Sequence, residues 1–74
     1  MFCIFARFFN TSNKRNSIQT IKVEFDTNPS YITLQDLIEK LNIDFNNYSF
    51  AKATTFLNKN SILNNNDYIN IFNK

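Results

Sequence analysis

The residues that could perform chemistry in this chain are few. Cys3 is the single cysteine among 74 residues and there is no histidine, so a Cys–His or Ser–His nucleophile cannot be assembled. The same counts leave too few nitrogen and sulfur ligands for a zinc or related metal site. The carboxylates show no pairing suited to acid–base catalysis. We therefore expect a protein that is not an enzyme and that holds no cofactor or metal.

Three polar features have a structural interpretation beside a functional one. Cys3 lies in an apolar segment, which predicts an unreactive thiol rather than a nucleophile. Asp67 could contact a partner, but its place before an apolar strand favours a turn that closes on its own backbone. Lys14 and Arg15 are the only adjacent basic pair and could meet an acidic partner, yet loop cations are usually solvated.

Charge and hydropathy also limit the partners that we expect. The formal net charge is +2 and the basic residues are scattered, which predicts no nucleic-acid partner. The apolar segment 1–9 is interrupted by Arg7 and is too short for a membrane span or a signal core. Together with the single cysteine, which indicates a reducing compartment, these features predict a cytoplasmic protein without a membrane partner.

The elements that position these residues form one small domain. Residues 2–9 and 18–25 are rich in aromatic and β-branched side chains and predict two strands, joined as a hairpin by a polar loop at 10–17. The second strand alternates most regularly, with Ile21, Val23 and Phe25 on one face.

Residues 33–41 predict the main helix. Thr33 suits the N-cap and Asp36 follows three residues later. The apolar stripe consists of Leu34, Leu37, Ile38 and Leu41. Asn42 suits a left-handed C-cap, because the chain has no glycine and fourteen asparagines. The bias toward Asn, Lys, Ile and Phe is also typical of an AT-rich genome.

Shorter elements are expected before and after the helix. They are a connector at 26–31, an irregular segment at 45–49, a strand at 50–57, a turn at 58–60, a short strand at 61–63, a turn at 64–66 and a last strand at 68–72. This order predicts an α+β fold with a mixed sheet of four or five strands and one helix packed on one face, the β-grasp (ubiquitin-like) arrangement over residues 1–74.

The chain resembles the ubiquitin-like sulfur carriers of the ThiS/MoaD family at three places. "FARFF" at 5–9 is similar to the segment that ends the first strand in the molybdopterin-synthase members. "TLQDLIEKLNID" at 33–44 is similar to the family helix and its exit. "FLNKNSILNNNDYINIF" at 56–72 is similar to the family's turn and last strand, with Asn60 and Asn66 near positions where the family prefers glycine.

The resemblance also implies a chemistry that the sequence as given does not carry. Family carriers end in a slim Gly-Gly tail whose carboxylate is adenylated and converted to a thiocarboxylate. Here the sequence ends in Phe72, Asn73 and Lys74, which are neither slim nor long enough for such a tail, and the chain has no glycine. We therefore expect a protein-binding module that docks on a larger enzyme or host factor, or that forms a homodimer. The alternatives are a carrier of molybdopterin or thiamine biosynthesis with a missing tail, and a TGS-like RNA-associated domain, which a basic face would favour.

Strand alternation predicts where such a module would bind. If the helix covers one face of the sheet, the inward side chains are Phe2, Ile4, Ala6, Phe8, Ile21, Val23, Phe25, Ile69 and Ile71. The expected partner-binding residues on the opposite face are Phe5, Phe9, Tyr68 and Phe72, with Phe56 at the margin. Exposed aromatic groups of this kind usually mark a contact surface, unless a loop or a register shift covers them.

Overall fold

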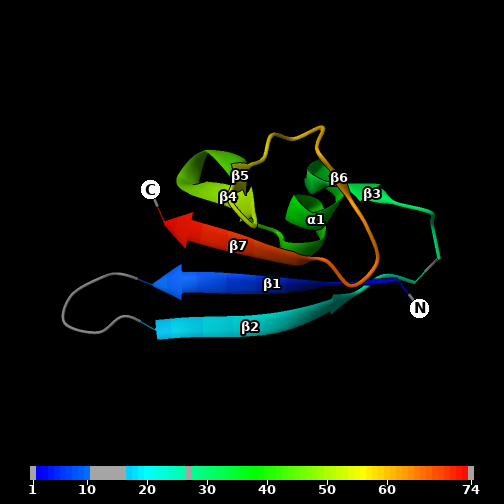
Figure 1. The fold of residues 1–74 in the computed structure, drawn as a ribbon, viewed down its shortest axis with the longest axis horizontal. Helices are drawn as coiled ribbons and strands as arrows, with labels where there is room; N and C mark the ends of the chain where they lie inside the picture. The colour runs from blue at the N-terminus through cyan, green and yellow to red at the C-terminus, as the bar shows by residue number, and fades with distance from the viewer. Residues whose placement is uncertain (1, 11–16, 27, 74) are drawn as a thin grey trace.

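The computed structural model describes residues 2–10, 17–26 and 28–73 (Figure 1). Of the loop predicted at 10–17, residues 11–16 with Lys14 and Arg15 lie outside the described residues, while Asn10 and Ser17 belong to strands. The strands are β1 (Cys3–Asn10), β2 (Ser17–Glu24), β3 (Ile32–Thr33), β4 (Tyr48–Lys52), β5 (Thr55–Phe56), β6 (Ile62–Leu63) and β7 (Tyr68–Asn73). The helices are α1 (Leu34–Leu41) and the 3-10 turn η1 (Phe45–Asn47).

The main sheet has five strands in the order β2-β1-β7-β4-β5. β1 and β7 run parallel at its centre, as their arrows in Figure 1 show, and the other neighbours are antiparallel. β3 and β6 form a separate two-stranded sheet. The predicted α+β architecture, a mixed sheet with one main helix, is therefore confirmed.

Local sequence determines both ends of α1. The Thr33 hydroxyl accepts from the Asp36 backbone N–H, and the Asp36 carboxylate accepts from the Thr33 backbone N–H, which makes a capping box. Asn42 ends the helix in the left-handed conformation, with φ 58° and ψ 47°. Both caps were predicted from the sequence, so the helix begins and ends where its polar residues specify.

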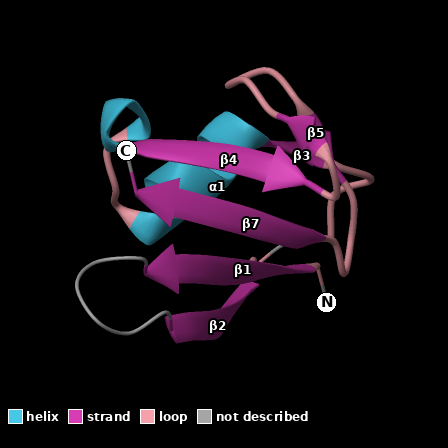
Figure 2. Ribbon diagram, turned by 60° about the vertical axis from the view of Figure 1, so that its left-hand side comes forward, coloured by secondary structure: helices cyan, strands magenta, loops and turns pink. Residues whose placement is uncertain are grey.

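The helix packs on one face of the main sheet. Leu34 and Leu37 are fully buried, Ile38 is nearly so, and Leu41 is half-buried against the core. Figure 2 shows α1 behind β4 and β7, with the other face of these strands toward the viewer. The buried core comprises Phe2, Ile4, Ala6, Val23, Ile32, Leu34, Leu37, Ile38, Phe50, Leu63, Ile69 and Ile71.

The predicted inward face of the first strands is confirmed, although not every side chain on it is buried. Phe8 and Phe25 are half-buried against the core, but Ile21 is 38% exposed. Ile21 lies opposite the fully buried Ala6, on the predicted face, in β2 at the edge of the sheet. The edge position therefore leaves Ile21 exposed on the face that the alternation assigned to it.

The region after the helix differs most from expectation. The strand predicted at 50–57 is a tight hairpin of β4 and β5, which turns at Ala53 with φ 56°. β4 begins at Tyr48, inside the segment 45–49 that was expected to be irregular. The short strand predicted at 61–63 is β6, but it pairs with β3, where no strand was expected and Thr33 was predicted only as the helix N-cap. Of the helices in the described residues, none is long and apolar enough to cross a membrane.

Candidate functional site

The sheet face opposite α1 carries most of the predicted aromatic residues. Along β1 and β7, alternate side chains enter the core, so the intervening ones lie on this opposite face. We call the following residues of the two central strands the aromatic face: Phe5, Arg7, Phe9, Tyr68, Asn70 and Phe72. The parallel register places Phe5 beside Tyr68 and Phe9 beside Phe72.

The aromatic side chains of this face form two stacked pairs. The ring centroids of Phe5 and Tyr68 are 4.7 Å apart with an interplanar angle of 15°, and those of Phe9 and Phe72 are 4.9 Å apart at 24°. Neighbouring strands are themselves about 4.7–4.9 Å apart. Rings that stack across this spacing stand upright on the sheet, so their edges rather than their faces point to solvent.

Arg7 occupies the middle of the aromatic face. Its guanidinium carbon lies 5.7 Å from the centroid of the Phe9 ring and 5.9 Å from that of the Tyr68 ring. At this range a cation is attracted by both rings, so the charge is held between the two pairs. From the sequence, Arg7 was interpreted only as an interruption of an apolar segment. The signal for its role was its position two residues from both Phe5 and Phe9, which puts all three side chains on the same face of the strand.

Asn70 lies beside Arg7 in register and carries an unsatisfied group. Its Oδ1 atom is buried and makes no hydrogen bond within the described part of the chain. Such an atom costs about 1–3 kcal/mol of stability. A buried polar group kept at this cost beside Arg7 on a mainly aromatic face marks a position that packing alone does not explain.

The exposure of the predicted residues differs within the face. Phe5, Phe9 and Phe72 are half-buried, whereas Tyr68 is 53% exposed. Phe56 is 73% exposed on β5, in the same cross-strand row as Asn70 but separated from it by Ala51 of β4. The structure thus brings four of the five predicted residues together and leaves Phe56 apart at the far edge.

Cys3 and the turn at 64–66 have a structural role. The Cys3 thiol donates to Asn66 Oδ1 at 3.1 Å, and the Cys3 backbone N–H donates to Asn65 Oδ1 at 2.9 Å. The thiol is buried. Among the described residues, positive φ occurs at Asn42, Ala53 and Asn66, so Asn66 adopts the turn conformation expected of it and Asn60 does not.

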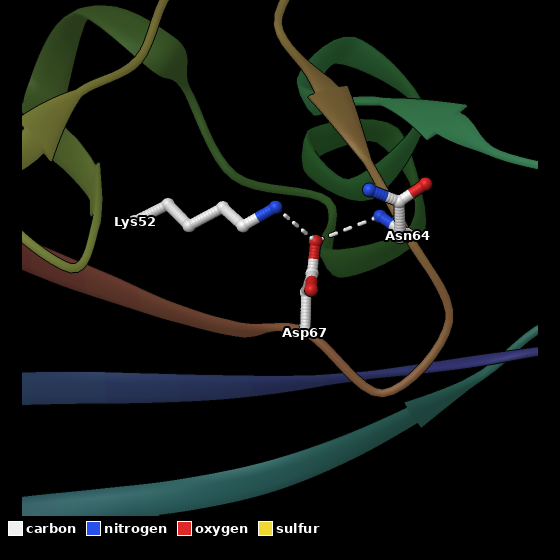
Figure 3. A network of polar contacts seen from close by, with 3 residues as sticks. All are labelled: Lys52, Asn64 and Asp67. Atoms are coloured by element: carbon white, nitrogen blue, oxygen red, sulfur yellow. Dashed lines mark hydrogen bonds and ion pairs between the residues drawn. The ribbon is translucent and has the colours of Figure 1, made fainter.

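Asp67 closes its own turn, as predicted, and also forms an ion pair that was not foreseen (Figure 3). Its Oδ2 atom accepts from the Asn64 backbone N–H at 2.7 Å and lies 2.7 Å from Lys52 Nζ. These contacts tie the start of β7 to the end of β4. Because the pair is partly solvated, its contribution to stability is at most about 1 kcal/mol.

A second surface feature lies on the helix side. It is a shallow hollow of about 530 Å³ lined by Phe25, Pro29, Tyr31, Ile32, Asp36, Glu39 and Lys40. Within the described ranges, no group of three Cys, Asp or Glu residues is placed to hold a metal ion. The aromatic face is the better candidate site, because it combines stacked rings, a cation held between them and an unsatisfied buried amide.

Comparison with protein-family models, with curated proteins and with solved structures found no match to this chain. What the geometry defines is a class: a small α+β protein with a five-stranded mixed sheet, an accessory two-stranded sheet and one main helix.

Proposed function

We propose that this chain is a β-grasp domain that binds another protein through its aromatic face. The observation that carries the proposal is the pair of upright aromatic stacks around Arg7 on the sheet face that α1 leaves uncovered. The strand order supports the fold assignment, because it places the first and last strands parallel at the centre with an antiparallel neighbour, β2 or β4, on each side. This is the arrangement that the resemblance to the ThiS/MoaD family implies.

The composition of the face suits a protein surface. Aromatic residues and arginine are enriched at protein interfaces, where they supply most of the binding energy. Burying an exposed aromatic side chain contributes about 1.5–3 kcal/mol, so two or three of these rings would support micromolar affinity after association costs. Arg7 favours a partner that places a carboxylate or a carbonyl opposite the centre of the face.

A second candidate is a single-stranded nucleic acid, because aromatic rings beside an arginine can stack on bases. The orientation of the rings favours a protein instead. Stacking on a base requires a free ring face, but each ring has one face covered by its stacking partner at less than 5 Å, and Arg7 lies over the Phe9 and Tyr68 rings. Ring edges that point outward suit van der Waals contact with an apolar protein surface better than they suit a flat base.

Two tyrosines of equal exposure allow a matched test. Tyr68 on the aromatic face is 53% exposed, and Tyr31 beside the helix-side hollow is 52% exposed. Wild-type chain, Tyr68→Ser and Tyr31→Ser are each used as bait in extracts of cells that encode this chain, and captured proteins are quantified by mass spectrometry. We expect a partner whose recovery falls roughly tenfold with Tyr68→Ser and is unchanged with Tyr31→Ser.

The double variant Phe5→Ser/Phe72→Ser should abolish that capture. Circular dichroism must show that its fold is retained, because each ring is half-buried by its neighbour. Recovery that depends on Tyr31 rather than Tyr68 would overturn the proposal. So would binding of a fluorescent single-stranded oligonucleotide that Tyr68→Ser removes, because that result would assign the face to nucleic acid.

A further inference from the structure

The outer edge of β2 has no partner strand among the described residues, and Figure 1 shows it at the border of the sheet. The Phe25 backbone N–H donates to the Phe2 carbonyl, which fixes the hydrogen-bonding phase of the strand. In an antiparallel ladder, alternate residues turn their backbone groups toward the same neighbour. The backbone groups of Val23 and Ile21 therefore face β1, and those of Glu24, Lys22 and Thr20 face outward.

Side-chain charge distinguishes among the registers in which two β2 edges could pair antiparallel. A register that places Lys22 opposite Lys22, or Glu24 opposite Glu24, sets like charges against each other. A register with Lys22 opposite Thr20 puts Glu24 opposite Ile18, so neither charged side chain has a partner of opposite charge. When Lys22 of each copy lies opposite Glu24 of the other, a two-fold axis passes through Val23 and two opposite-charge pairs form. In this register the outward backbone groups of Lys22 and Glu24 also meet.

The same register accounts for an exposed apolar side chain. On the helix side of the sheet it sets Ile21 opposite Phe25 of the second copy. Ile21 is 38% exposed and Phe25 is half-buried in the isolated chain. Pairing covers both, so the exposure that the edge position imposes on Ile21 is removed in the assembly.

We propose that two copies of this chain pair antiparallel through β2, centred on Val23, and form one continuous sheet. The two-fold axis is perpendicular to this sheet, so both aromatic faces lie on the same side and present a doubled binding surface. The pairing uses the strand edge and does not depend on the proposed function of the aromatic face. Lys22 and Glu24 then favour this register, since of the four alignments it is the one that pairs each lysine with a glutamate.

Charge reversal at the two positions tests the register. Wild-type chain, Lys22→Glu, Glu24→Lys and the double variant are compared by sedimentation velocity across a micromolar to millimolar concentration series. Each single variant sets like charges opposite one another and should weaken dimerisation by at least roughly tenfold, whereas the double variant restores opposite pairs and should return to wild-type behaviour. Lys59→Glu, an exposed turn residue with the same change in net charge, should leave the dimer intact.

Amide hydrogen exchange supplies an independent measurement of the same pairing. The Lys22 and Glu24 N–H groups face outward in a single copy, so their exchange should slow as the protein concentration rises, while Val23 is protected throughout. A wild-type chain that stays monomeric at millimolar concentration overturns the proposal. A dimer that the charge variants do not weaken overturns it as well. If Tyr68→Ser dissociates the dimer and Lys22→Glu does not, self-association belongs to the aromatic face instead.

Discussion

The packing of α1 on the sheet can be tested by truncating one side chain. Leu37 is fully buried between the helix and the sheet, so Leu37→Ala removes its contacts and leaves a cavity. Leu→Ala substitutions in a core lower the free energy of unfolding by about 2–5 kcal/mol. Because Leu37 has no exposed surface, we expect a loss of about 3 kcal/mol or more. At about 0.05–0.15 kcal/mol per residue, a chain of 74 residues has a total stability of about 4–11 kcal/mol. The substitution therefore removes about a quarter or more of the stability of the domain.

Urea unfolding followed by circular dichroism measures the loss. With a slope near 1 kcal/mol per molar urea, the midpoint should fall by about 3 M. The thermal midpoint should fall by about 12–24 °C, since 1 kcal/mol shifts it by about 4–8 °C in a domain of this size. Leu41→Ala on the same stripe is the matched control, because Leu41 is half-buried and should lose about 1 kcal/mol. Equal losses at Leu37 and Leu41, or a loss below about 1 kcal/mol at Leu37, would refute the packing described above.

Three further substitutions test the backbone and the polar groups. Ala53→Gly should raise the free energy of unfolding by about 1 kcal/mol, because alanine is strained at φ 56°; an unchanged thermal midpoint would contradict this. Thr33→Ala should lower the free energy of unfolding by about 1 kcal/mol through loss of the capping box, whereas Thr33→Ser should be nearly neutral in the same urea titration. Asn70→Val should raise the free energy of unfolding by about 1 kcal/mol by removing the unsatisfied buried oxygen. A decrease would mean that this amide is hydrogen-bonded in solution.

The regular elements were predictable because side-chain period and polar caps act locally. The alternation in β1, β2 and β7 and the stripe of α1 each repeat within a few residues, and Thr33 and Asn42 mark the helix ends. The aromatic face followed from the same alternation once the two central strands were taken as neighbours.

Other features could not be predicted, because their causes are not local. The hairpin of β4 and β5 turns at Ala53, a residue that carries no turn signal and adopts positive φ under tertiary constraint. β3 exists only because β6 pairs with it. The exposure of Ile21 depends on the place of β2 at the edge of the sheet, and the position of Arg7 between the stacks depends on the pairing of β1 with β7.

The parallel pairing of β1 and β7 also constrains how the chain can acquire its structure during synthesis. Phe5 lies beside Tyr68, so the centre of the sheet forms only when segments from the two ends of the chain meet. The β1–β2 hairpin can form early, but its helix-facing side stays uncovered until later segments arrive, and closing so long a loop slows folding. On a ribosome, β7 must leave the exit tunnel before the central strand pair can close. Until then the apolar side of the hairpin is available to chaperones or to other nascent chains.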